Sequence, residues 1–138
     1  MTPQLLNQKI ESLRNCIQRI EGKLPFAAGQ LETDFDLQDI ISVNLERAVQ
    51  ICVDIAGKVL AGSSGPSPAT MCESFALLAQ EGVIPQSIAL GMRKSVGLCN
   101  MLVHEYSKIN WKIVHDVCHL HLGVFRDFAA AVISKTGK

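Results

Sequence analysis

The fold is decided by residues 36–61, which read DLQDIISVNLERAVQICVDIAGKVLA. Apolar side chains recur in this stretch every three or four residues, the spacing that keeps them on one face of an α-helix. These residues are Leu37, Ile40, Ile41, Leu45, Ala48, Val49, Cys52, Ile55, Ala56 and Val59. So wide an apolar stripe, sustained over about seven turns, predicts a long helix at the centre of a helical core.

The rest of the chain predicts four more helices. Residues 3–21 repeat the helical spacing and end before Gly22 and Pro25. The run Gly62–Pro68, rich in glycine, serine and proline, predicts a loop. The remaining helices are expected from Thr70, which forms a capping box with Glu73, to Gly82; from Pro85 towards Tyr106; and from the cap Asn110 to about Ser134.

Two further expectations concern the segments at either end of this pattern. Residues 22–35 are predicted to be loop. Four acids there and just beyond are expected to be solvated or to cap the next helix, with docking of a partner as the alternative: Glu32, Asp34, Asp36 and Asp39. The last helix is predicted to be continuous, with an inward face made of Ile113, Val117, Leu120, Val124, Phe128 and Val132.

Five helices with short connections and no convincing strand predict an all-α fold, an antiparallel helical bundle. At 138 residues the chain has the length of one typical domain, and we expect residues 1–138 to form a single domain. Aromatic residues make up only 5% and apolar residues 48%, which favours aliphatic packing between helices over a β-sandwich. So much apolar sequence in a small chain suggests that a second copy or a partner covers part of the surface.

Charge and cysteine content exclude several classes of protein. Thirteen Lys and Arg balance thirteen Asp and Glu, so the chain is no polybasic binder and any contact with nucleic acid must be local. The five cysteines are widely spaced and form no CxxC pair, which indicates reduced thiols rather than a disulfide or zinc framework. The sequence shows no secretory leader and no run of ~18 apolar residues, so we expect a cytoplasmic protein without a membrane span.

The segment with the most chemical content is residues 98–106, which read LCNMLVHEY. Asn100 and His104 are four residues apart and therefore share one face of a helix. Cys99 and Tyr106 are seven apart and lie on a face roughly 100–140° further round. Because a two-fold interface brings the same patch of each subunit together, two such helices can join both faces in one groove.

These residue types suit the cleavage of RNA. An imidazole titrates near neutral pH and can carry a proton, and a neighbouring amide can orient a phosphate or a ribose. His104 and Asn100 therefore suit attack of a 2′-hydroxyl on its own phosphate, which requires no metal. Residues 91–113 hold four bases and one acid, for a local charge of 4 − 1 = +3, and the expected RNA contacts are Arg93, Lys94 and Lys108.

The same string resembles the signature of the HepT-like toxins of the HEPN superfamily, in which Arg, usually followed by Asn, precedes His by four intervening residues and Tyr comes two after the His. The likeness continues in the acidic entry to residues 36–61 and in the runs 44–48, 52–56 and 74–78. It implies a HEPN-like all-α homodimer that acts as a metal-independent endoribonuclease in a cleft between its subunits.

The resemblance also implies a partner and a role for each motif residue. Such toxins are paired with a minimal nucleotidyltransferase antitoxin, which uses ATP and Mg²⁺ to transfer AMP to the motif tyrosine and so silences the site. The toxin itself needs no cofactor. Carried over to this sequence, Tyr106 accepts AMP, His104 is the catalytic acid and base, and Asn100 supports it.

One position departs from the family pattern, because residue 99 is Cys where the motif has Arg. A guanidinium offers a permanent charge and a fork for phosphate oxygens, whereas a thiol is mostly neutral at pH 7. Three interpretations are open: this copy is catalytically impaired, a base such as Lys94 or Arg126 replaces the arginine, or Cys99 is an attenuating change that allowed a toxic protein to be produced. The alternative function is a non-catalytic helical binding module that keeps the dimer and antitoxin surfaces.

A second group of histidines invites interpretation as a metal site. His115 and His119 are four residues apart on one helical face. His121 points elsewhere, Cys118 falls in the apolar phase, and no third ligand stands at a matching position. We therefore expect structural roles for these residues and no metal.

Overall fold

The computed structural model describes residues 2–63, 65–105 and 107–136, which form seven α-helices and one π-helical turn and no strand. The helices are α1 (Pro3–Glu21), α2 (Ala28–Thr33), α3 (Phe35–Ala61), α4 (Met71–Gln80), α5 (Gln86–His104), α6 (Trp111–Asp116) and α7 (Gly123–Thr136). The π-helical turn, Val117–His121, lies between α6 and α7. The predicted all-α bundle is confirmed.

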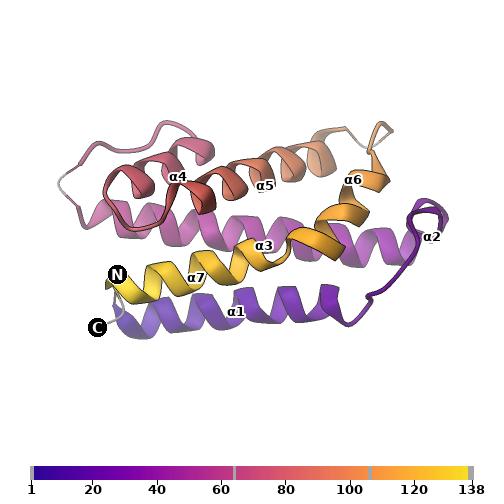
Figure 1. Ribbon diagram of the computed structural model, residues 1–138, viewed down its shortest axis with the longest axis horizontal. Helices are drawn as coiled ribbons and strands as arrows, with labels where there is room; N and C mark the ends of the chain where they lie inside the picture. The colour runs from indigo at the N-terminus through magenta and orange to yellow at the C-terminus, as the bar shows by residue number, and fades with distance from the viewer. Residues whose placement is uncertain (1, 64, 106, 137–138) are drawn as a thin grey trace.

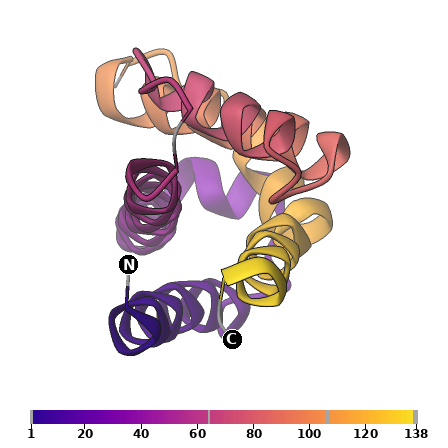
Figure 2. The same ribbon diagram turned by 90° about the vertical axis from the view of Figure 1, so that its left-hand side faces the viewer.

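Helix α3 runs along the whole bundle, with α4 and α5 on one side and α1 and α7 on the other (Figure 1). The end-on view separates these two pairs of helices clearly (Figure 2). Helix α3 contacts all four of them, and its side chains Ile41, Ala48 and Ile55 are completely buried. The sequence prediction that residues 36–61 form the centre of the core is therefore confirmed.

Aliphatic side chains fill most of this core, as the composition indicates. Among the few aromatic residues, Phe75 of α4 and Phe128 of α7 are completely buried. Their rings meet edge to face with centroids 5.6 Å apart, an arrangement that aromatic pairs prefer. This contact joins α4, on one side of α3, to α7, on the other side.

The predicted helix ends are largely confirmed by their hydrogen bonds. The Thr70 hydroxyl accepts from the N–H of Glu73 at 3.1 Å, and the Glu73 carboxylate accepts from the N–H of Ala69 at 3.1 Å. Asp34 accepts from the N–H of Leu37 at 3.0 Å, so this acid caps α3 as expected. Gly82 has a φ of +77°, a left-handed conformation that favours glycine after the end of α4.

The prediction that residues 22–35 are entirely loop is wrong. They contain the short helix α2, whose Leu31 is completely buried. The amide of Gln38 donates to the carbonyl oxygens of Leu31 at 3.0 Å and Glu32 at 3.1 Å, which fastens α2 to the first turns of α3. Six residues are too few for helical periodicity to be visible in the sequence.

The prediction of a continuous last helix is also wrong. Residues 111–121 and 123–136 meet at an angle of 50°. A π-helical turn holds more residues than an α-helical one, so it changes which side chains face the core beyond it. Leu120, which lies in the turn, is 72% exposed although the sequence predicts that it points inwards, whereas Phe128 is buried as predicted. Ile113, which precedes the turn, is 47% exposed against the same prediction, because Val114 is the residue of α6 that faces the core.

Helix α5 ends at His104, somewhat earlier than the prediction that runs it towards Tyr106, which lies outside the described residues. Within the described ranges no single helix is long and apolar enough to cross a membrane. Residues 111–121 and 123–136 together are long and apolar enough to cross a membrane, but they are bent by 50°, and buried core helices of other proteins have the same length and composition.

Candidate active site

Asn100 and His104 lie together in an open hollow at the C-terminal end of α5. Both side chains are exposed, and the hollow, of about 420 Å³, is completed by Gly97, Met101 and Glu105. The four-residue spacing places them on one face of a regular helix, as the sequence predicts. Solvent and a large substrate can therefore reach an imidazole and an amide side by side.

Cys99 is not part of this hollow. Its side chain is half-buried and packs against the core. Burial raises the pKa of the Cys99 thiol, and the nearby carboxylate of Glu46 on α3 raises it further. Burial also raises the pKa of Glu46 itself. The sequence gives no signal of this α3 carboxylate, because only the packing of α3 on α5 brings it near residue 99.

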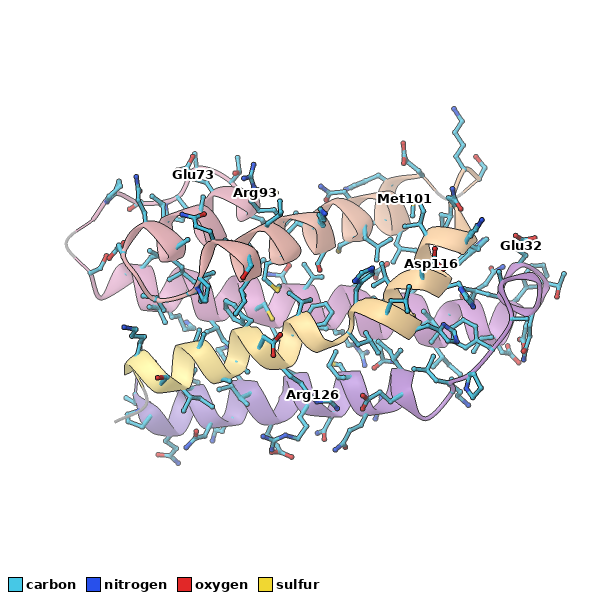
Figure 3. The ribbon with its side chains drawn as sticks, in the orientation of Figure 1. Glu32, Glu73, Arg93, Met101, Asp116 and Arg126 are labelled. Atoms are coloured by element: carbon cyan, nitrogen blue, oxygen red, sulfur yellow. The ribbon has the colours of Figure 1, made fainter. Side chains whose placement is uncertain are left out.

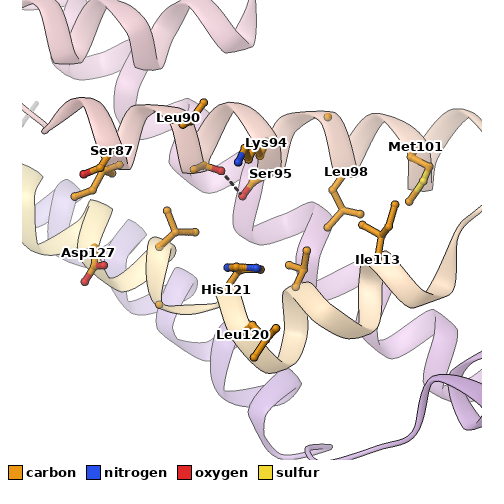
Figure 4. Close-up of a pocket in the computed structure, with 16 residues that line it drawn as sticks. Ser87, Leu90, Lys94, Ser95, Leu98, Met101, Ile113, Leu120, His121 and Asp127 are labelled. Atoms are coloured by element: carbon orange, nitrogen blue, oxygen red, sulfur yellow. Dashed lines mark hydrogen bonds between the residues drawn. The ribbon is translucent and has the colours of Figure 1, made fainter.

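A groove of about 720 Å³ opens beside the hollow, between α5 and the segment formed by α6, the π-helical turn and the start of α7 (Figure 4). Leu90, Ile113 and Leu120 line it, and all three are exposed apolar side chains. Gly97 and Met101 line both the groove and the hollow. An uncovered apolar surface thus leads directly to His104.

The basic residues near the motif occupy different places. Lys94 lines the groove, whereas Arg93 is exposed on α5 outside that lining (Figure 3). Lys108 is exposed in the turn after α5. The structure thus places only Lys94 of these three next to the apolar surface.

Arg126 is committed to another contact, which argues against the interpretation that it replaces the motif arginine. Its guanidinium donates to both carboxylate oxygens of Glu21 at 2.6 and 2.7 Å, joining α7 to α1. This hydrogen bond lowers the pKa of Glu21 and raises that of Arg126. Figure 3 shows Arg126 where α7 faces α1, on the side of α7 away from α5.

His115 and His119 have the structural roles expected of them. Their rings stack with centroids 4.1 Å apart. His119 Nε2 accepts from the N–H of Phe26 at 3.2 Å, and its Nδ1 donates to the carbonyl oxygen of His115 at 2.8 Å. The Nδ1 bond fixes the ring on its own helical segment, and the Nε2 bond holds the chain after α1 against that segment. Among the described residues no group of three metal-ligating side chains occurs.

Comparison with known proteins identifies the family of this chain. A family model described as HepT-like, Ribonuclease HepT-like, matches residues 13–132. The chain belongs to the HepT-like family. A relative named mRNA nuclease HepT, from Shewanella oneidensis, is 36% identical over 124 residues, which cover 90% of this chain and 92% of the relative. Membership shown on so much of the chain confirms the resemblance carried by residues 98–106.

Solved structures show the same HepT-like fold. A tri-AMPylated HEPN toxin of Shewanella oneidensis, in complex with an MNT antitoxin, is 34% identical with a TM-score of 0.87, covering 94% of this chain and 97% of that one. A toxin–antitoxin complex with AMP-PNP is 34% identical with a TM-score of 0.85, covering 92% and 96%. The cytosolic protein YutE of Bacillus subtilis, of unknown function, is 10% identical with a TM-score of 0.81, covering 98% and 93%, and shows the fold alone.

Proposed function

We propose that this chain is the RNA-cleaving toxin of a toxin–antitoxin pair, acting in the cytoplasm as one HepT-like domain over residues 1–138. The observation that carries the proposal is the open hollow that holds Asn100 and His104 in a chain of this family. The relative named mRNA nuclease HepT supports RNA as the substrate class. The local charge of +3 around the motif supports contact with a phosphate backbone.

The proposed reaction is metal-independent transesterification. The 2′-oxygen of a ribose forms a bond to the adjacent phosphorus while the bond from phosphorus to the 5′-oxygen breaks. His104 takes the proton from the 2′-hydroxyl and returns a proton to the leaving 5′-oxygen, and Asn100 orients the phosphate or the ribose. The products are a 2′,3′-cyclic phosphate and a 5′-hydroxyl.

We propose that a second copy of the chain covers the groove and makes the site a cleft of a two-fold homodimer. Leu90, Ile113 and Leu120 are exposed and gather around one groove, and a clustered apolar surface of this kind favours association. A two-fold axis beside this groove sets the hollow of each copy next to that of the other. In this arrangement RNA in the cleft is contacted by three basic residues beside it, Arg93, Lys94 and Lys108.

The proposed regulator is a minimal nucleotidyltransferase antitoxin that transfers AMP from ATP, with Mg²⁺, to Tyr106. The structural relative that is AMPylated in complex with an MNT antitoxin supports this partner. Tyr106 follows His104 by two residues, so an added AMP would place bulk and negative charge where RNA enters. The ATP and Mg²⁺ belong to the antitoxin, and the toxin itself needs no cofactor.

Cys99 in place of the motif arginine makes this copy an impaired enzyme in our proposal. A half-buried thiol with a raised pKa supplies no positive charge to a phosphate. The second candidate, a non-catalytic binding module, is favoured by the same observation. It keeps the dimer and antitoxin surfaces and has no turnover.

Cleavage of RNA on a denaturing gel distinguishes these functions. Cys99→Arg is expected to cleave about 10²- to 10³-fold faster than the unchanged chain, the usual effect of a charged transition-state contact. His104→Ala is expected to abolish cleavage in both backgrounds, while Lys58→Ala, an exposed change on α3 far from the hollow, leaves it unchanged. Absence of cleavage in every variant, with circular dichroism showing folded protein, would establish the binding module instead.

A further inference from the structure

The groove beside the hollow of His104 contains the basic side chain of Lys94. Lys94 is exposed and lines the groove from α5. The other ionisable residues that line it are His121 and Asp127. Lys94 is in no ion pair within the described part of the chain, so its ammonium group is available to an anion.

Lys94 cannot act on the His104 of its own chain. The two residues are ten positions apart on α5, which corresponds to about 15 Å along the helix. The four-carbon stem of a lysine does not bridge that distance. An encounter between these two side chains therefore requires two copies of the chain.

Gly97 and Met101 line both the groove and the hollow. A second copy that covers the groove and reaches the hollow would therefore cross α5 at these two residues. A Cβ added at Gly97 meets nothing within 4 Å, and a glycine on a helix face allows a neighbouring backbone to approach closely.

A two-fold axis at this crossing determines which residues of the two copies face each other. Midway between Gly97 and Met101 is the level of residue 99, and a perpendicular two-fold axis there pairs positions equally far on either side. Lys94 is five residues before this level and His104 five after it. If the two α5 helices run antiparallel about this axis, Lys94 of one copy lies opposite His104 of the other, across an interhelical distance of about 8–10 Å that a lysine can span.

We propose that Lys94 of each subunit holds the scissile phosphate at the other subunit's His104, supplying part of the positive charge that Cys99 does not, so that this copy keeps a slow, residual cleavage. This inference rests on the proposed function, because it concerns RNA cleavage in a dimer. The ammonium group contacts a non-bridging phosphate oxygen, and no bond to the lysine forms or breaks. Because charge on the phosphate oxygens grows during attack, the contact is stronger in the transition state.

A heterodimer of two variants tests this arrangement. Chains carrying Lys94→Ala and His104→Ala are co-expressed with different tags, and the mixed dimer is purified by both tags. Acting across the interface, Lys94 of the His104→Ala chain meets the intact His104 of the Lys94→Ala chain. The mixed dimer then has one complete site and is expected to cleave at about half the rate of the unchanged dimer. The proposal would be overturned if the mixed dimer cleaved RNA at no more than half the rate of the Lys94→Ala homodimer.

Homodimers of single variants give an independent readout. Lys94→Ala is expected to lower kcat about 10- to 100-fold, the effect of losing a hydrogen bond to a charged group, with little change in KM. Lys94→Arg should retain most of the rate and Lys58→Ala all of it. In a Cys99→Arg background the loss on Lys94→Ala should be much smaller, because the arginine then supplies the charge.

The remaining outcomes separate this inference from the proposed function. If Lys94→Ala dissociates the dimer in light scattering, Lys94 serves the interface, for example through Asp127, and the inference fails. If the unchanged chain shows no cleavage while Cys99→Arg cleaves through His104, Lys94 does not replace the arginine, yet the proposed function stands. If no variant cleaves, the proposed function fails as well.

Discussion

In our proposal, residue 99 sets how strongly the site of this chain stabilises charge on a phosphate. In the family motif the position is an arginine, and here a thiol stands between the core and Glu46 of α3. Removing the charge leaves the imidazole of His104 and the amide of Asn100 in place, since both stand in the hollow and Cys99 does not. In the proposed mechanism, mutation at residue 99 therefore changes phosphate stabilisation without removing the group that transfers the proton.

We predict that the Cys99 thiol is poorly reactive. Burial and the Glu46 carboxylate both raise its pKa, so little thiolate is present at neutral pH. Iodoacetamide at pH 7.5 should label Cys99 at least about tenfold more slowly than free cysteine, as followed by peptide mass spectrometry. Glu46→Gln should speed the labelling, because one of the two causes of the raised pKa is removed.

The control for this experiment is labelling of the urea-unfolded chain, in which Cys99 should react like free cysteine. Rapid labelling of the folded protein, with no effect of Glu46→Gln, would contradict the prediction of a poorly reactive thiol and make Cys99 a candidate nucleophile.

At the residue scale the sequence predicts the shared face of Asn100 and His104 correctly, because helical spacing alone determines it. The Glu46 contact is absent from any local pattern, because fifty-three positions separate the two residues.

At the scale of elements, the packing of α5 against α7 depends on a glycine. A Cβ added at Gly91 would lie 2.6 Å from Cγ2 of Val124 and 3.6 Å from its Cβ. Valine is stiff about its first side-chain bond, so it cannot move aside freely. The absence of a side chain at Gly91 lets the start of α7 approach α5 and forms one end of the groove.

We predict opposite effects for two glycine-to-alanine substitutions. Gly91→Ala should lower the free energy of unfolding by about 1–3 kcal/mol, the usual effect of overpacking. Gly57→Ala, inside α3 with nothing within 4 Å of the added Cβ, should raise it by about 0.5–1 kcal/mol through helix propensity. Urea unfolding followed by circular dichroism measures both, and equal stabilisation of the two variants would show that Val124 is free to move.

The elements themselves were predictable to different degrees. Long amphipathic helices such as α1 and α3 follow from periodicity. Asp34, Thr70 and Asn110 mark the starts of α3, α4 and α6 by local hydrogen bonding. The bend between α6 and α7 does not follow, because a π-helical turn has the same composition as the helix around it. Contacts of His119 with Phe26, ninety-three positions away, hold that bend in place.

At the scale of the whole molecule, the described residues leave an apolar surface uncovered beside the candidate site. Leu120 is 72% exposed because the π-helical turn rotates it away from the core, and it lines the groove with Leu90 and Ile113. Apolar exposure of this kind favours association with a second surface. In our proposal the same interface that covers the groove completes the site.

We predict that Leu120→Glu converts the proposed dimer to a monomer, because a carboxylate then replaces an apolar side chain that the interface covers, and its desolvation opposes association. Light scattering should show half the mass of the unchanged protein, and RNA cleavage should fall at least about tenfold. Phe35→Glu is the matched control, since Phe35 is 73% exposed but lies outside the groove. It should remain dimeric and active.

Monomeric behaviour of both Leu120→Glu and the unchanged chain, with full cleavage, would refute the dimeric site. Both substitutions are at exposed positions and should change the free energy of unfolding by no more than about 0.5 kcal/mol in the monomer. Circular dichroism at equal concentration checks that the fold is retained.

The amino-acid sequence by itself determines the all-α fold, the central helix α3 and the pairing of Asn100 with His104. Each of these depends on the spacing of side chains along one helix, which is a local property. Only the tertiary structure decides the groove, the place of Glu46 beside Cys99 and the engagement of Arg126 by Glu21. Those features arise where distant helices pack, and their geometry depends on a π-helical bend and a glycine contact that local spacing does not encode.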